Sequence, residues 1–257
     1  MRIARRALVG ILLLMLLGSV PGSATWSIIV LDRRTGMIGV AGASCTSDVS
    51  GIMALVPGTG ALVAQAVSSP PAMREALRLL RAGVAPDSVL RVITTSSLDT
   101  AIQARQYGMA TFAGGQVQFT GTGTPDYHGE RSADGVLVQG NILTGPAVLD
   151  RAMGAIQAAR KAGKPMEDVV LAGLKAGADA GGDLRCGAQR ATSAFLAVAR
   201  PGDLANWPYL TLRVLDVARG SSTNAVDLLQ QRLAHWRAGG GAKYRITSES
   251  VKPDSTR

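Results

Sequence analysis

The chain has 257 residues and a net charge of +9, with 47% hydrophobic and 4% aromatic residues. Its basic residues are scattered over predicted helical faces, and the few aromatic residues do not alternate with them, which argues against a nucleic-acid partner. A solvated basic surface explains the charge better, and it leaves open a mild attraction to an anionic envelope surface.

The first 24 residues have the pattern of a secretory signal peptide. Three arginines precede an apolar segment, 7–17, that is too short for a confident membrane span. Small residues at 22–24 predict cleavage before Thr25, which removes the three arginines and leaves a net charge of +6. We therefore expect a periplasmic or secreted protein with no integral membrane span after cleavage. An uncleaved N-terminal anchor is the alternative.

Cleavage at this point would expose Thr25 as the first residue of the mature chain. A terminal threonine combines a hydroxyl that can attack a carbonyl with an amine that can activate this hydroxyl. The chemistry needs the threonine at the tip of a strand, near backbone or Asn N–H donors that form an oxyanion hole. The alternating, β-branched residues 26–32 meet the strand condition. A mature N-terminus without a catalytic role is the alternative.

The remaining pattern predicts one domain over 25–238, followed by a flexible polar tail over 239–257. Hairpins are expected from 26–32 with 37–44, and from 106–113 with 116–122. Further strands are expected at 61–67, 135–142, 192–199 and 209–217, and helices at 70–82, 89–94, 146–162, 166–180 and 224–236. The segments 45–51 and 125–134 are expected to be irregular. Runs of strands separate from runs of helices, which predicts an α+β fold with antiparallel sheets covered by helices.

Two cysteines, Cys45 and Cys186, predict a disulfide bond because exported proteins fold in an oxidising environment. Such a bond closes a long loop and could contribute about 3–5 kcal/mol. Two free buried thiols, or Cys45 as a nucleophile, are the alternatives. The only two histidines, His128 and His235, lie in no recognisable catalytic context.

Three motifs resemble an uncharacterised bacterial family. They are 25–29 followed by Asp32, Thr35-Gly36 and 39–44, the run Gln139-Gly140-Asn141-Ile142-Leu143, and the run 181–185 with Gln189 and Ser193-Ala194 after it. Together they resemble domain-of-unknown-function family 1028, which is grouped with the N-terminal nucleophile (Ntn) hydrolases. The resemblance covers about 25–217 and implies a four-layer αββα sandwich of two mainly antiparallel sheets. It makes Thr25 the candidate nucleophile, exposed here by signal peptidase in place of autocleavage, and it brings no settled substrate.

Four further residues are candidates for the site. Asn141 could donate to an oxyanion, with turn capping as the alternative. Ser44 could hydrogen-bond the N-terminal amine, whereas Asp32 is expected to cap its own turn. Asp183 and Arg185 could bind a substrate carboxylate or amine, although a structural ion pair that orders the Gly-rich loop is the preferred interpretation. The Lys or Arg that Ntn enzymes often place near the nucleophile cannot be assigned.

The sequence thus predicts an exported hydrolase of small amide or peptide substrates that uses an N-terminal threonine and needs no metal or cofactor. His128 has no second ligand at metal-binding spacing, and no Gly-rich segment is followed by the Lys-Ser/Thr of a phosphate loop. A catalytically silent Ntn-like binding domain of the envelope is the alternative. A Ser or Cys hydrolase is less favoured because no nucleophile elbow is present. Ntn-like folds often associate, so a homodimer is a further expectation.

Overall fold

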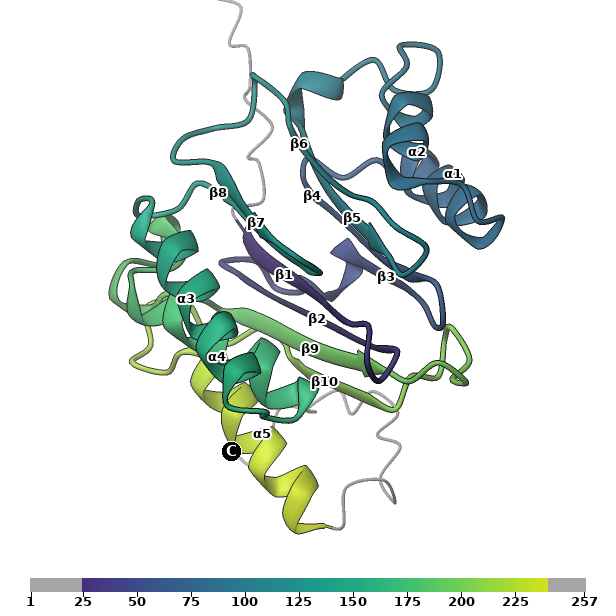
Figure 1. The fold of residues 1–257 in the computed structure, drawn as a ribbon. Coiled ribbons are helices and arrows are strands. Elements are labelled where there is room, and N and C mark those ends of the chain that lie inside the picture. The colour runs from purple at the N-terminus through teal and green to yellow at the C-terminus, as the bar shows by residue number, and fades with distance from the viewer. Residues whose placement is uncertain (1–24, 240–257) are drawn as a thin grey trace, which may run out of the picture.

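The computed structural model describes residues 25–239, so the predicted signal peptide and residues 240–257 of the predicted tail lie outside it. Figure 1 shows two β-sheets packed face to face, with helices on both outer sides. The strands are β1 (Thr25–Asp32), β2 (Met37–Ser44), β3 (Met53–Val56), β4 (Gly60–Ala66), β5 (Arg105–Thr111), β6 (Gln116–Thr120), β7 (Gly129–Ala133), β8 (Val136–Asn141), β9 (Ser193–Ala199) and β10 (Leu210–Val214). The helices are α1 (Pro70–Arg81), α2 (Pro86–Ile93), α3 (Ala147–Lys161), α4 (Met166–Asp179) and α5 (Ala225–Ala238).

All strand pairings in the two sheets are antiparallel. The larger sheet has the order β10-β9-β2-β1-β8-β7, and the smaller has the order β3-β4-β5-β6. Helices α3, α4 and α5 cover the outer face of the larger sheet, whereas α1 and α2 cover that of the smaller one (Figure 1). A third apolar cluster fills the space between the sheets. The expected four-layer αββα sandwich is therefore confirmed.

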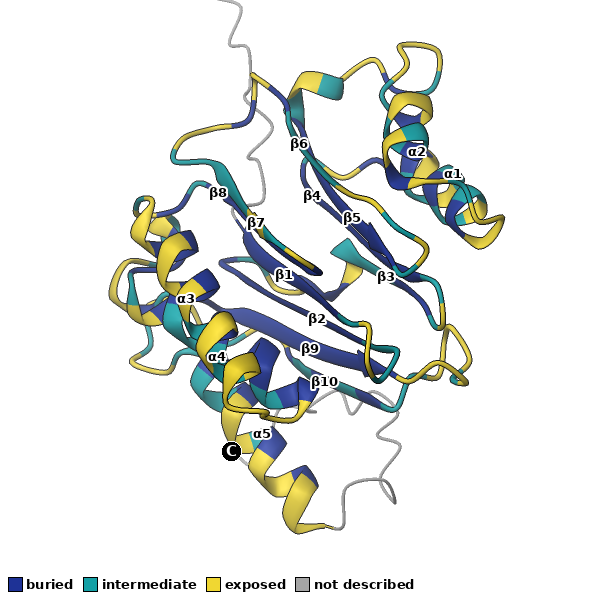
Figure 2. Ribbon diagram, in the orientation of Figure 1, coloured by how far each residue is buried: buried dark blue, intermediate teal, exposed yellow. Residues whose placement is uncertain are grey.

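Strand β1 lies at the centre of the larger sheet and is buried on both faces (Figure 2). Successive side chains of a strand point to opposite faces. Trp26 and Ile28 accordingly pack in the helix-side cluster, whereas Ile29 and Leu31 pack between the sheets. Thr25 and Ser27 have the parity of Ile29, so the strand carries a polar end into the space between the sheets.

Small residues on α4 let this helix approach β1 closely. A Cβ added at Gly173 would lie 2.5 Å from Ile156 Cγ1 of α3, and one added at Gly177 would lie 2.8 Å from Trp26 Nε1. The indole N–H of Trp26 donates to the carbonyl oxygen of Leu174 at 3.3 Å. The helix is thereby fixed over the strand that begins at Thr25.

Both predicted hairpins and the predicted cap of α5 are confirmed. Gly36 has a φ of +69° in the first hairpin turn, and Asn224 accepts a hydrogen bond from the N–H of Val226 at 3.0 Å. Two details of the prediction differ from the structure. The segment 125–134 contains strand β7, and β3 precedes the turn at 57–59. β7 has no β-branched or aromatic residue, so its pairing with β8, and not its own propensity, makes it a strand. Within residues 25–239, no helix combines the length and apolarity needed to cross a bilayer.

Candidate active site

Four polar residues form a row across one end of the larger sheet. Thr25 pairs with Asn141 of β8 on one side and with Ser44 of β2 on the other, and Ser44 pairs in turn with Ser193 of β9. Paired residues of antiparallel strands direct their side chains to the same face, here the space between the sheets. All four are 0% exposed. The row brings together the candidate nucleophile and two of the predicted site residues.

Two glutamines of the smaller sheet connect it to Thr25. Gln65 of β4 donates from Nε2 to the carbonyl oxygen of Thr25 at 3.2 Å and to Gln106 Oε1 at 2.6 Å. Its Oε1 accepts a hydrogen bond from the hydroxyl of Ser27 at 2.6 Å. Asn141 donates from Nδ2 to the same Gln106 Oε1 at 3.1 Å. These amides therefore form a buried arch from β4 across β5 to β8.

Backbone carbonyl groups fix the orientation of this network. Gln106 Nε2 lies 3.0 Å from the carbonyl oxygen of Gly140, which can only accept a hydrogen bond, so Gln106 Oε1 must be the acceptor toward Asn141. Asn141 thus uses one N–H for Gln106 and retains a second. Its Oδ1 is buried and has no hydrogen-bond partner among the described residues.

A buried ion pair supports β5 beside Gln106. Arg105 binds Asp99 with Nε at 2.8 Å and Nη2 at 3.0 Å, and it also donates to the carbonyl oxygen of Val67 at 2.7 Å. The hydrogen bonds from Arg105 hold the pKa of Asp99 below its usual range. Burial, with a smaller contribution from Asp99, raises the pKa of Tyr107 to about 12. The two chain neighbours of Gln106 therefore keep their charge states at neutral pH, with Arg105 positive and Tyr107 neutral.

The Gly-rich loop closes over the end of β2. Asp183 Oδ2 accepts the backbone N–H of Cys45 at 2.6 Å, and its Oδ1 accepts the backbone N–H of Arg185 at 2.9 Å. Arg185 Nη2 pairs with Asp183 Oδ2 at 2.8 Å, so the ion pair preferred for these two residues is present. The predicted disulfide between Cys45 and Cys186 is also present.

A family model described as a family of unknown function, DUF1028, matches residues 25–222. The chain belongs to this family. The crystal structure of the DUF1028 protein SPO2555 from Silicibacter pomeroyi is 26% identical, with 86% of this chain and 93% of that chain covered and a TM-score of 0.71. No curated protein matches this DUF1028 chain.

Two structures of Anbu, the ancestral β-subunit, also align with the DUF1028 chain. The protein from Yersinia bercovieri is 9% identical over 87% of this chain and 99% of that one, with a TM-score of 0.40. A Gly-1 mutant from Hyphomicrobium sp. strain MC1 is 10% identical over 88% and 99%, with a TM-score of 0.34.

Of two further residues from the sequence analysis, Asp32 lies far from the row, whereas His128 directly precedes Gly129, the partner of Gly140 beside Asn141. Asp32 occupies the opposite end of β1, where it accepts hydrogen bonds from Arg34 N and Thr35 Oγ1, so its predicted turn-capping role is confirmed. His128 Nδ1 lies 3.2 Å from Asp126 Oδ1, a contact that lacks hydrogen-bond geometry. Among residues 25–239, no three His, Cys, Asp or Glu side chains are grouped as a metal site would require.

Sequence reasoning missed the glutamines of the arch and the position of Ser193 in the row. Gln65 and Gln106 are 2% and 0% exposed in strands that are otherwise mostly apolar or small. An amide inside a strand of otherwise apolar or small residues is the available signal, because a buried polar group needs partners. Those partners come from strands distant in the sequence, so the sequence indicates that the two glutamines are unusual but does not predict which residues they bind.

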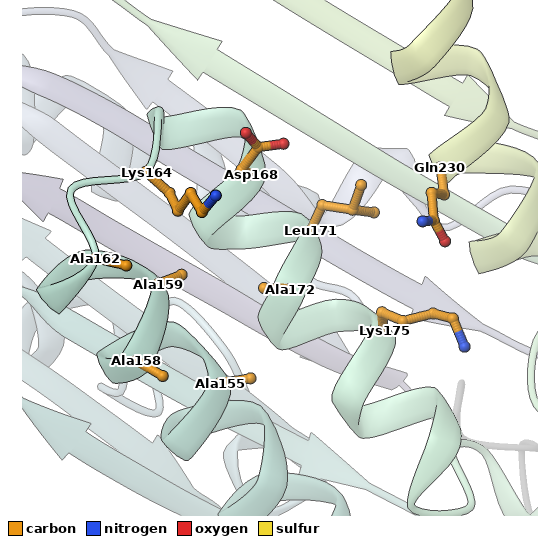
Figure 3. Close-up of a pocket in the computed structure, with 10 residues that line it drawn as sticks. All are labelled: Ala155, Ala158, Ala159, Ala162, Lys164, Asp168, Leu171, Ala172, Lys175 and Gln230. Carbon is orange, nitrogen blue, oxygen red and sulfur yellow. The ribbon is translucent and has the colours of Figure 1, made fainter.

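A separate hollow of about 630 Å³ lies on the outer helix layer of the DUF1028 domain (Figure 3). Its lining residues come from α3, α4, α5 and the turn between α3 and α4: Ala155, Ala158, Ala159, Ala162, Lys164, Asp168, Leu171, Ala172, Lys175 and Gln230. The lining includes no hydroxyl or thiol, and the row at Thr25 faces the other side of the larger sheet. We therefore assign the candidate active site to the row.

Proposed function

We propose that this protein is an exported amidohydrolase whose nucleophile is the hydroxyl of Thr25 after cleavage of the peptide bond before it. The observation that supports this most directly is the position of Thr25. It is the first residue of the central strand and pairs with Asn141 and Ser44 between the two sheets. A terminal nucleophile needs such a rigid strand tip beside hydrogen-bonding groups.

In the proposed mechanism, the Thr25 amine accepts the hydroxyl proton while Oγ attacks the carbonyl carbon of the substrate amide. The oxyanion is stabilised by the second N–H of Asn141. The C–N bond then breaks, and the protonated amine gives its proton to the leaving nitrogen, which leaves an ester on Thr25. The same amine next takes a proton from water, which attacks the ester. The carboxylic acid is released, and Oγ regains a proton.

The surroundings of Thr25 favour this use of the amine. The amine must be neutral to act as a base, and desolvation disfavours its charged form. The arch that binds the carbonyl of Thr25 is built from neutral amides and a hydroxyl. Before cleavage, the nitrogen of Thr25 belongs to a peptide bond and has no basic lone pair, so cleavage supplies the base.

The remaining predicted residues take supporting roles in this proposal. Ser44 hydrogen-bonds the amine from the opposite side of the row. Asp183 and Arg185 form the wall next to the row: the buried Asp183 holds the loop and Arg185 in place, and the partly exposed Arg185 binds a polar group of the substrate. The proposed location is the periplasm or the outside of the cell, and the proposed substrates are small amides or peptides.

The test uses the protein expressed with its own first 24 residues and exported. Intact mass should place the mature N-terminus at Thr25, and a β-lactone probe should then acylate this residue. Thr25→Ala should abolish labelling, whereas Thr25→Ser should retain it because serine has the same hydroxyl. Thr122, an exposed loop threonine, offers the matched control, and Thr122→Ala should label normally.

Two outcomes would overturn the hydrolase proposal. One is a mature chain that retains any residue ahead of Thr25. The other is equal labelling of the wild type and Thr25→Ala. A correct N-terminus without labelling or amide cleavage would instead support the alternative, a catalytically silent binding domain of the envelope.

A further inference from the structure

The side chain of Asn141 has an unsatisfied acceptor next to Thr25. Asn141 is 0% exposed, and its Oδ1 has no hydrogen-bond partner among residues 25–239. A buried acceptor without a partner is energetically unfavourable. Such an atom is therefore a candidate acceptor for a hydrogen-bond donor that forms only after the chain is cleaved.

The arch excludes the flipped orientation of this amide. Exchanging Nδ2 and Oδ1 of Asn141 would place two carbonyl oxygens against each other at Gln106 Oε1, which already accepts from Gln65 Nε2. Gln106 cannot flip either, because its Nε2 donates to the carbonyl oxygen of Gly140. Asn141 therefore presents its oxygen as the unpaired atom.

We propose that Asn141 Oδ1 accepts a hydrogen bond from the α-amine of mature Thr25 and so directs the lone pair of this amine toward Oγ. The inference rests on the proposed cleavage before Thr25, since the extra N–H exists only afterwards. Thr25 and Asn141 are direct partners in the ladder between β1 and β8, so the donor and the acceptor are on neighbouring strands at the same level. Asn141 is thus a positioning residue, in addition to its proposed contact with the oxyanion.

Few charged side chains lie near the α-amine of Thr25, so the pKa of this amine should depend mainly on its contact with Asn141. Asp183 lies in the loop over β2, where its carboxylate forms an ion pair with Arg185 and accepts a hydrogen bond from the backbone N–H of Cys45. From β7, Glu130 reaches the network through a hydrogen bond from Thr120 Oγ1 at 2.5 Å. The other groups near the amine are neutral: Ser27 of β1, Ser44 of β2, Gln65 of β4, Gln106 of β5 and Asn141 of β8. One further titratable side chain, His128, directly precedes β7.

The experiment measures the titration of the α-amine itself and requires no hydrolysis. Competitive acetylation of the mature protein over a pH series, read by mass spectrometry of the N-terminal peptide, gives the midpoint. The reference is a free α-amine, with a pKa of about 7.7–8.0. Asn141→Asp keeps the acceptor and adds a charge, so the midpoint should rise by about one unit or more. Asn141→Leu removes the acceptor, so the midpoint should fall.

Gln118→Glu is the matched control. It introduces a carboxylate on β6, where Gln118 Nε2 donates to the carbonyl oxygen of Val138, away from the row. It should shift the midpoint by less than half of the Asn141→Asp shift. Equal midpoints in the wild type and both Asn141 variants would overturn the inference. A rise in Asn141→Asp without a fall in Asn141→Leu would also overturn it, because charge proximity alone would then suffice.

The two proposals fail separately. If the midpoints move as expected while the β-lactone probe does not label Thr25, the positioning role stands and the hydrolase proposal falls. Thermal unfolding of each variant checks that it is folded. If Asn141→Asp does not fold, Asn141→Leu, which is uncharged and of similar size, decides the outcome alone.

Discussion

The carboxylate of Asp183 accepts a hydrogen bond from the backbone N–H of Cys45 at 2.6 Å, although 138 positions separate the two residues. Cys45 directly follows Ser44, the neighbour of Thr25 in the row. The disulfide to Cys186 closes over the same junction. The Gly-rich loop is thus tied twice to the end of β2, by a hydrogen bond and by a covalent bond.

Removal of the disulfide should destabilise the protein without removing a side chain of the row. The double variant Cys45→Ser/Cys186→Ser should lose about 3–5 kcal/mol of unfolding free energy in urea, because the bond spans 141 positions and restricts the unfolded chain. The wild type in reducing agent should approach the same value, whereas the reductant should not affect the double variant. An unchanged urea midpoint would contradict this role.

Disruption of the amide arch should cost more than loss of a comparable surface glutamine. Gln106→Leu leaves donors of Gln65 and Asn141 without their buried acceptor, so the unfolding free energy should fall by about 2–4 kcal/mol. Gln116→Leu is the control, because Gln116 also hydrogen-bonds the backbone but is exposed, so water can replace its contacts. Equal losses in the two variants would show that the arch adds nothing to stability.

The Asp99–Arg105 pair should contribute stability that depends on pH. The pKa of Asp99 is lowered in the folded protein, so its contribution is present above the unfolded value, about pH 4, and is lost as the pH falls through the folded pKa. Asp99→Asn should lose about 3 kcal/mol at pH 7, because it leaves a buried guanidinium unpaired, and this loss should shrink in acid.

Urea denaturation between pH 2 and pH 7 measures this difference. Asp87, which pairs with Arg91 on the surface of α2, provides the control. Asp87→Asn should be indistinguishable from the wild type at every pH, since exposed pairs contribute little. A loss in Asp99→Asn that is constant with pH would refute the assignment.

Two glycines in the outer helices should respond to alanine with opposite signs. Gly154 of α3 has no atom within 4 Å of an added Cβ, so Gly154→Ala should stabilise the protein by about 0.5–1 kcal/mol through helix propensity. Gly173→Ala should destabilise it by about 1–3 kcal/mol, because the new methyl group overlaps Ile156 and Ile28. Thermal unfolding of the pair provides the check, and a gain in both variants would show that α4 can move away from β1.

The layer order and most elements follow from local patterns in the sequence. The hairpin of β1 and β2 combines alternation with a glycine turn, helices α1 to α4 have Pro near their starts, and α5 has an Asn cap. Strand β7 escapes prediction because its residues have no strand preference and its partner β8 supplies the pairing. Part of the site could be predicted: Thr25 and Asn141 are polar residues at strand ends. Gln65 and Gln106 could not be assigned, because their hydrogen bonds to the larger sheet form only when the two sheets pack together.

β1 joins both of its neighbours from Thr25 onward, so severing the peptide bond ahead of Thr25 removes none of its pairings with β2 or β8. Folding and activation are therefore separable under the proposed mechanism. A purification tag left at the N-terminus would give a well-folded preparation that shows no turnover in any assay. Screens for a substrate should accordingly use material tagged at the other end, with its first residue verified beforehand.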